Sequence, residues 1–384
     1  MKRSSASRIL TTHVGSLPRP DDLAELLLTR QDQAIDEAVF QERVRVATDE
    51  VVARQVQIGI DVISDGEMSK PGYIDYVRER LQGFSGPIDA AGSFYFVDLA
   101  DFPEFVLSTY QNTRVRIATC ESSIVYAGLD YLSRDLSNFK AALEKTPATE
   151  AFIPAVSPGL LAVFMPNKYY RTYDDYVMAF ADAMHVEYKA ITDAGFLLQI
   201  DGPDVTAVSD FYTWMRDEVE RRGVRAVQEL HIDALNRAVA GIPPEKIRMH
   251  LCWANYQGPH THDQPLREVL EPTLRAHVGA ISFEAANPAH AHEWEIFKEV
   301  RLPDGMIILP GVIDTKSQVV EHPRVVTQRI VQFAQLVGPE NVIASTDCGF
   351  GTFVGAGMVH PKVAWLKLKS LVEGAAMASK ELSQ

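Results

Sequence analysis

Short β-branched and apolar runs alternate along the chain with longer amphipathic stretches, and this alternation constrains the fold more than any other feature. Most runs end in glycine, proline, serine or aspartate, as strands do before a loop. Strands that alternate with helices form parallel sheets, because each helix carries the chain back to the starting edge. Strands are predicted at residues 9–13, 61–64, 152–156, 197–200, 247–251, 280–283, 306–309 and 341–345.

The stretches between these runs predict helices with recognisable ends. One helical region follows Ser16 and closes at Gly59, and Gly195 is placed to end another helix. Between residues 85 and 147 the pattern is irregular, so we expect an insertion after the second strand, with residues 113–119 as a further candidate for a barrel strand in it. The remaining helices are predicted at residues 172–194, 211–240, 266–277, 292–300, 323–337 and 361–378.

Polar side chains able to take part in chemistry follow the predicted strands, at the point where each strand ends. In a closed barrel all these ends meet at one mouth, whereas an open doubly wound sheet would gather fewer of them. We therefore predict an α/β chain with a (β/α)₈ TIM barrel, as a single domain over residues 1–384. The strand-end residues are His13, Asp65, Glu67, Asp201, His250, Cys252, Glu284, Asp314 and Cys348.

The charge and the termini narrow the class of partner. The net charge is −14 and no cluster of lysine and arginine stands out, which argues against nucleic acid and against an anionic membrane surface. The first seven residues are polar and no run of about 18 apolar residues occurs, so no signal peptide or membrane span is expected. We expect a cytoplasmic protein, and we leave its oligomeric state open, a homo-oligomer included.

The three cysteines are too few for a disulfide framework. His250 and Cys252 are two residues apart near a strand end, so their side chains point to the same face. Glu284 and Cys348 end two other strands. One imidazole, two thiolates and one carboxylate suit Zn²⁺ better than Mg²⁺ or Ca²⁺. The alternative is that these cysteines are small core residues, which is our expectation for Cys120.

These four residues resemble the zinc ligands of the cobalamin-independent methionine synthase family, in its catalytic barrel. The family's pattern of His-x-Cys, Glu and Asp-Cys-Gly matches His250, Cys252, Glu284 and residues 347–349. The resemblance runs from about residue 11 to residue 351 and includes further matching segments. These are residues 11–19 (Thr-Thr-His-Val-Gly-Ser-Leu-Pro-Arg), 65–67 (Asp-Gly-Glu), 199–201 (Gln-Ile-Asp) and 310–314 (Pro-Gly-Val-Ile-Asp).

The resemblance implies a zinc-dependent S-alkyltransferase. In the family, zinc holds homocysteine as a thiolate, which takes a methyl group from a methyl-tetrahydrofolate. Carried over to matching positions, Ser16 would contact the substrate carboxylate, and Glu67 and Asp201 its ammonium group. Asp314 lies in the segment that carries the family's catalytic acid, and Phe164 stands where a tryptophan packs on the folate.

Departures from the family pattern leave the thiol and the alkyl donor open. Lys316 replaces the family's histidine, so it is a candidate acid or anion ligand, and His260 is a candidate acid in the loop at residues 259–263. The single-barrel branch of the family includes epoxyalkane:coenzyme M transferases, in which a zinc-bound thiolate opens an epoxide. The thiol is therefore homocysteine or one like coenzyme M, and the donor a methyl-folate or an epoxide. A third alternative is a barrel with only a structural zinc.

Overall fold

The structure is a computed structural model of the chain, and it describes residues 1–86, 88–89, 101–104, 116–207, 213–355 and 358–384. Eight parallel strands pair in the order β1-β12-β11-β10-β9-β8-β7-β2, and a parallel bridge between Thr12 and Val62 joins the two end strands. The predicted (β/α)₈ barrel is therefore confirmed. Its strands are β1 (Leu10–Thr11), β2 (Val62–Ser64), β7 (Glu150–Val156), β8 (Leu197–Asp201), β9 (Ile247–His250), β10 (Ala280–Phe283), β11 (Ile307–Ile313) and β12 (Ile343–Thr346).

The period-two alternation of the strands divides their side chains between two faces. In β8, Leu198 and Ile200 join the large apolar core, whereas Leu197 belongs to a small separate cluster. Gln199 and Asp201 share the face of Leu197. The same alternation in β9 and the loop after it puts His250 and Cys252 on the face opposite Met249 and Leu251, which pack in the large core. Alternation alone thus turns polar side chains toward the barrel axis.

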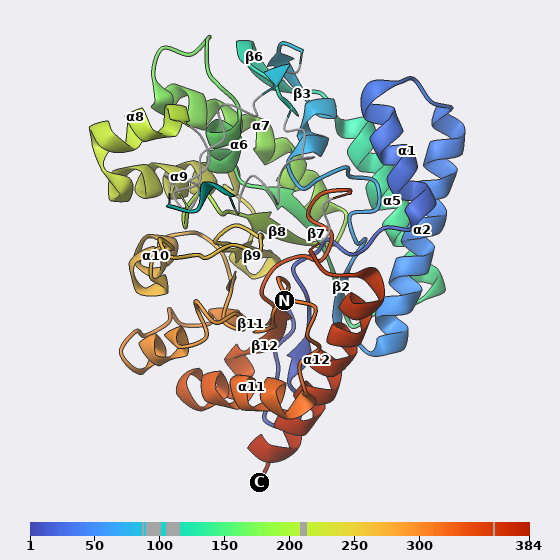
Figure 1. Cartoon of the computed structure of the whole chain (residues 1–384), viewed down its shortest axis with the longest axis vertical. Helices are drawn as coiled ribbons and strands as arrows, with labels where there is room; N and C mark the ends of the chain where they lie inside the picture. Colours follow the sequence, from blue (N-terminus) through green and yellow to red (C-terminus); the bar gives the residue numbers. More distant parts are fainter. Residues whose placement is uncertain (87, 90–100, 105–115, 208–212, 356–357) are drawn as a thin grey trace.

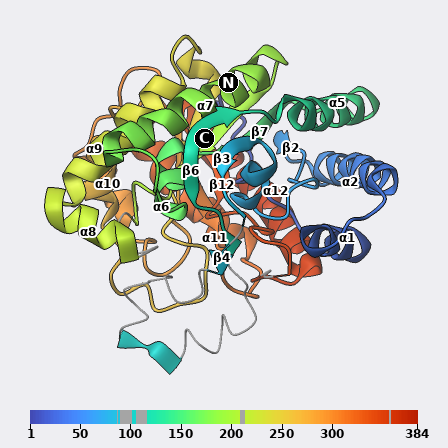
Figure 2. The ribbon, with the colours of Figure 1, turned by 90° about the horizontal axis from the view of Figure 1, so that it is seen from above.

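Helices surround the barrel, with α1, α2 and α5 on one side and α8, α9 and α10 on the other (Figures 1 and 2). The side chain of Thr172 caps the start of α7, and the left-handed Gly59 ends α2, where the sequence predicts a helix end. The helices are α1 (Asp21–Asp32), α2 (Glu37–Ile58), α5 (Leu129–Lys145), α6 (Pro158–Phe164), α7 (Tyr173–Asp193), α8 (Thr213–Arg222), α9 (Val224–Ala238), α10 (Leu266–Thr273), α11 (Pro323–Val337) and α12 (Pro361–Leu382).

Three predicted elements differ in the structure. The barrel has its eight strands without residues 113–119: the first three of these lie outside the described residues, and β5 (Arg116–Ile117) pairs antiparallel with β4 (Ile88–Asp89) away from the barrel. The single helix predicted at 211–240 is two helices, because Gly223 adopts a φ of 85° between them. Residues 292–300 form a 3₁₀ turn, η4 (Glu293–Lys298), in place of an α-helix.

The range that we predicted as an insertion contains elements of two kinds. β6 (Cys120–Tyr126) pairs antiparallel with β3 (Leu81–Phe84), which precedes this range, whereas α5 packs against α2 as a helix of the barrel's outer layer. The limits of the insertion and the single-domain organisation stay predictions.

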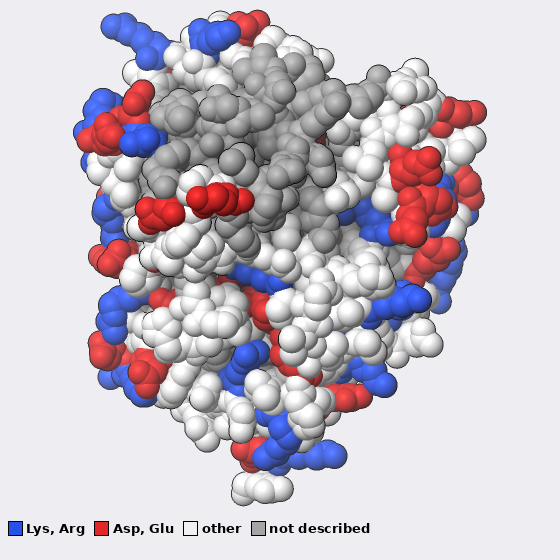
Figure 3. Space-filling model, viewed as in Figure 1, with Lys and Arg blue, Asp and Glu red and all other residues white. Residues whose placement is uncertain are grey.

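Charges are mixed over the described part of the surface. Figure 3 shows lysine and arginine interspersed with aspartate and glutamate, and pairs such as Arg43 with Asp22 account for part of this mixture. None of the helices in the described part of the chain has the length and apolarity needed to cross a bilayer.

Candidate active site

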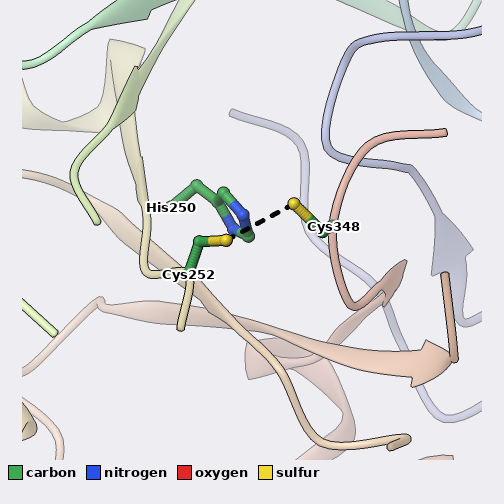
Figure 4. Close-up of side chains that lie close together, drawn as sticks. All are labelled: His250, Cys252 and Cys348. Atoms are coloured by element: carbon green, nitrogen blue, oxygen red, sulfur yellow. Dashed lines mark hydrogen bonds between the residues drawn. The ribbon is translucent and has the colours of Figure 1, made fainter. Parts of the chain in front are cut away.

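Three of the four predicted metal ligands come together at the C-terminal mouth of the barrel. His250 ends β9, Cys252 follows two residues later, and Cys348 lies just after β12. One potential ligand atom from each lies within 4.8 Å of the other two, and all three side chains are buried (Figure 4). Because the main chain of Leu251 still bonds to Ser282 of β10, pairing extends past β9 and carries Cys252 on the same face as His250.

The donor set fits a zinc ion. The Sγ atoms of Cys252 and Cys348 are 3.5 Å apart, and two sulfurs on a tetrahedral zinc would be about 3.8 Å apart. The Nε2 atom of His250 is buried and has no hydrogen-bond partner among the described residues, while its Nδ1 atom is held by Ser282 Oγ at 3.2 Å. An imidazole fixed through one nitrogen and open at the other is arranged as a metal ligand.

The two thiols differ in acidity. A hydrogen bond from Cys252 lowers the pKa of Cys348 to about 6, although burial opposes this shift. The same contact raises the pKa of Cys252 well above its ordinary value. The pair therefore holds one thiolate readily, and a cation at the site would favour the second. Cys120 is buried away from this pair, as expected, and burial raises its pKa to about 11.

Glu284 is not among the three atoms that converge. Its Oε1 accepts a bond from the Trp253 main chain at 3.0 Å, and its Oε2 accepts from Asn287 Nδ2 at 2.7 Å and from Lys316 Nζ at 2.6 Å. Glu284 is nevertheless close enough to raise the pKa of Cys252. Its part as a fourth ligand stays a prediction, and the structure describes it as the buried partner of Lys316.

Lys316 is not a solvated loop lysine. Its side chain is 9% exposed and its ammonium group pairs with Glu284. Burial lowers the pKa of Lys316, but the charge of Glu284 outweighs this effect and raises it. A lysine with a raised pKa is a weak proton donor near neutrality, so the geometry favours an electrostatic part for Lys316 over the predicted part as an acid.

Asp347 organises the loop behind the metal site. Its Oδ1 accepts bonds from the main-chain amides of Ala285 and Ala286, and its Oδ2 accepts from the amide of Asn287 at 2.8 Å. Asp347 precedes Cys348 and reaches the candidate ligand Glu284 through Asn287, whose side-chain amide donates to Asp347 Oδ2 at 3.0 Å and to Glu284 Oε2 at 2.7 Å. Asn287 lies three residues after Glu284, and it was not singled out from the sequence.

Backbone strain marks the loops of the mouth. Among the described residues, three non-glycine residues have a positive φ: Glu67 at 59°, Ala254 at 64° and His260 at 54°. Glu67 follows β2, and the other two lie in the loop after β9. For residues other than glycine, a positive φ costs free energy that the surrounding structure must offset. Such residues gather at functional sites.

The predicted substrate residues lie at the ends of β1, β2 and β8, with β7 between the last two strands. Ser16, Glu67 and Asp201 are all buried, and Ser16 contacts the segment that carries Cys348 through a bond from the Gly351 amide to its hydroxyl at 3.4 Å. Burial raises the pKa of Asp201 to about 7, and the charge of Glu67 adds to the rise. Two close, buried carboxylates would be stabilised by a cation between them.

The other predicted site residues are engaged in local contacts. Asp314 accepts a bond from the main chain of Lys316 at 2.8 Å, as in a turn. His260 contacts Asp263 and the Tyr256 carbonyl through its two ring nitrogens, which leaves neither nitrogen for a substrate. Phe164 is the last residue of α6 and is 8% exposed. The parts assigned to Asp314, His260 and Phe164 stay predictions.

Two buried histidines near the mouth are expected to differ in protonation at pH 7. His290 faces Glu293 through Nδ1 and Asp263 through Nε2, so both nitrogens must donate; burial lowers its pKa, but these carboxylates raise it to about 9. His13 accepts from the Gly15 amide, and burial lowers its pKa to about 4. Nitrogen NMR of labelled histidine should find His290 protonated at pH 7 and His13 neutral down to about pH 4. A neutral His290 at pH 7 would contradict the proposed bonding.

Known proteins resemble this chain both in sequence and in fold. A methionine synthase from Thermococcus kodakarensis is 24% identical over 97% of this chain and 94% of its own length, and one from Saccharolobus solfataricus is 25% identical over 97% and 96%. The structure of a B12-independent methionine synthase from Shewanella sp. W3-18-1, in complex with selenomethionine, superposes with a TM-score of 0.71 at 18% identity, covering 98% of this chain and 99% of that one.

The sequence pattern of one family covers most of the chain. Residues 9–93 and 161–373 match the family described as cobalamin-independent synthase, catalytic domain. The matched residues include all the metal-ligand candidates and both carboxylates predicted to bind the substrate. The chain therefore belongs to the cobalamin-independent synthase family and has the fold of its catalytic domain.

Proposed function

We propose that this protein methylates the sulfur of homocysteine with a zinc ion held by His250, Cys252 and Cys348. The observation that carries the proposal is the convergence of these three buried side chains at the mouth, beside two buried carboxylates. Structural zinc sites use four protein ligands, whereas catalytic sites use three and keep one position open. Three ligand atoms converge among the described residues, which supports a catalytic site, and Glu284 stays a predicted fourth ligand.

Zinc bound at this site would supply a Lewis acid that lowers the pKa of an incoming thiol. The protein's own residues supply the rest. As thiolates, Cys252 and Cys348 would give the site negative charge. Lys316 adds a positive charge nearby, where it pairs with Glu284. Glu67 and Asp201 are placed to hold an ammonium group, which would orient an amino-acid thiol. A cytoplasmic location would keep the three free cysteines reduced.

The proposed reaction transfers one methyl group. The sulfur of homocysteine forms a bond to the methyl carbon as the bond between that carbon and the donor nitrogen of a methyl-tetrahydrofolate breaks. The thiol loses a proton, and the donor nitrogen gains one. The family and the methionine synthase relatives favour this reaction over the opening of an epoxide by a thiol like coenzyme M.

A crossed assay tests the proposal. Zinc-loaded protein is given homocysteine or coenzyme M, each with a methyl-tetrahydrofolate or with an epoxide, and the products are measured by mass spectrometry. We expect methionine from homocysteine and the methyl donor. Product only from coenzyme M and the epoxide would replace the proposed function by the alternative, and no product from any pair would contradict a thiol alkyltransferase.

The substrate carboxylates should control the affinity for the ammonium group. Asp201→Asn is expected to weaken binding of homocysteine roughly 10-fold or more, because a charge-assisted bond contributes about 1.5–3 kcal/mol. Calorimetry on zinc-loaded protein measures the dissociation constant. Asp182→Asn, an exposed aspartate on α7 paired with Arg237, is the matched control and should leave it unchanged. Equal affinities for wild type and Asp201→Asn would remove Asp201 from the substrate site.

A further inference from the structure

Several buried polar atoms near the mouth have no hydrogen-bond partner among the described residues. They are Nε and Nη2 of Arg19, Oε2 of Glu67, and Nε2 of His250. Buried polar groups are bonded in the large majority of cases, so unpaired atoms in one place need an explanation. The open nitrogen of His250 is explained by a metal ion, and the oxygen of Glu67 by an ammonium group. The proposed function assigns no group of the substrate to the guanidinium of Arg19.

Arg19 is fixed on one side and open on the other. Its side chain is 3% exposed, and its Nη1 donates to the carbonyl of Gly351 at 2.6 Å. The nearest acidic oxygen to its Nη2 is Oε2 of Glu67, at 3.9 Å, which is beyond hydrogen-bond distance. Two donors, Nε and Nη2, therefore remain on one edge of a planar fork, the geometry that binds a carboxylate with two parallel bonds.

The fork lies beside the segment that carries a metal ligand. A Cβ atom added to Gly349 would be 2.0 Å from Ser16 Oγ, and one added to Gly351 would be 3.2 Å from Arg19 Nη1. These two glycines let the chain after Cys348 pass close to both side chains. Arg19, Ser16 and Cys348 thus belong to one wall of the mouth.

We propose that Arg19 binds the carboxylate of an α-amino-acid thiol and thereby selects this class of substrate. The inference rests on the proposed function and deepens it. The unpaired groups match such a thiol: His250 and the cysteines face the sulfur, Glu67 and Asp201 the ammonium group, and Arg19 the carboxylate. Ser16, which we predicted as a carboxylate contact, flanks the same position.

The arrangement of charges distinguishes an amino acid from a simple anion. Glu67 is close to the fork of Arg19, so a bound anion without a neighbouring cation would be repelled by that carboxylate. A zwitterion places its carboxylate on Arg19 and its ammonium group on Glu67. Thiols of the coenzyme M kind have a sulfonate and no ammonium group, and they would leave Glu67 buried and uncompensated.

Three thiols that differ by one group test the proposal. Homocysteine has both charged groups, 4-mercaptobutanoate lacks the ammonium group, and 3-mercaptopropylamine lacks the carboxylate. Dissociation constants are measured by calorimetry on zinc-loaded wild type and Arg19→Met. Wild type should prefer homocysteine to 3-mercaptopropylamine roughly 10- to 100-fold, the range of a charge-assisted pair. In Arg19→Met this preference should shrink to within about threefold.

A reciprocal variant and a control accompany this measurement. Glu67→Gln should reduce the preference of homocysteine over 4-mercaptobutanoate, with Asp201 left to hold the ammonium group, and keep its preference over 3-mercaptopropylamine. Arg222→Met removes a partly buried arginine at the end of α8 that pairs with Asp174 of α7, and it should leave both preferences unchanged. Because each preference is a ratio measured on one preparation, a partly unfolded variant does not distort it.

The outcomes separate this inference from the proposed function. If Arg19→Met keeps the full preference for homocysteine over 3-mercaptopropylamine, Arg19 is a structural residue and the inference is wrong, while the proposed function stands. If wild type binds none of the three thiols when loaded with zinc, the proposed function itself is contradicted. Equal loss for all three thiols in Arg19→Met would also overturn the inference, because it would indicate general damage to the site.

Discussion

Replacing Cys348 by serine is expected to remove zinc from the purified protein, from about one ion per chain to nearly none. Cys348 supplies one of three converging ligand atoms, and its thiol is the more acidic of the pair. A serine hydroxyl does not ionise near neutral pH, so the site would lose a thiolate and with it much of its affinity. Elemental analysis of protein dialysed against metal-free buffer measures the result, and methylation of homocysteine should be lost with the metal.

Cys120 provides the matched control for this experiment. It is equally buried but lies at the start of β6, where its thiol donates to the carbonyl of Ser122. Cys120→Ser keeps a donor for that bond and should retain the zinc. Full retention of zinc in Cys348→Ser would contradict the metal site described here, and loss of zinc in both variants would indicate global damage.

The barrel could be predicted because its strands carry a local signal. The run at β8 alternates between core residues such as Leu198 and inward residues such as Gln199, and this period needs no distant contact to be recognised. Gly223 adopts a positive φ that ends the first helix, a local signal that the helical pattern on both sides outweighed, whereas the antiparallel pairing of β5 depends on tertiary packing. For these two reasons the single helix at 211–240 and the barrel strand at 113–119 were wrong.

The site could be predicted only in part. His250 and Cys252 stand out because two metal-ligand types are spaced by two residues at a strand end. The ion pair between Glu284 and Lys316 joins two loops that follow different strands, so only the folded chain shows it. Arg19 lay inside a segment that matched the family, but an arginine next to two prolines gives no sign that its guanidinium is buried and half unpaired.

Arg248→Met is expected to destabilise the protein by about 3–5 kcal/mol, the second large effect. Arg248 is 1% exposed inside the barrel, and it donates to Thr12 Oγ1, to the carbonyl of His13 and to Gln199 Oε1, at 2.6–2.9 Å. Methionine fills much of the volume but leaves three buried acceptors without a donor. Each unsatisfied acceptor costs about 1–3 kcal/mol of stability. The midpoint of urea unfolding, followed by circular dichroism at pH 7, measures the loss.

The same substitution should also weaken binding at the predicted substrate site. Gln199 donates from its amide to Asp201 Oδ1 at 2.7 Å, and Arg248 holds the other end of that amide. Without Arg248 the amide can rotate, so affinity for homocysteine should fall even where the protein is folded. Arg267→Met removes an exposed arginine that pairs with Glu299, and it should change neither quantity appreciably. If Arg248→Met unfolds at the urea concentration of the wild type, the buried bonds inside the barrel contribute little, and the alignment of Asp201 needs another cause.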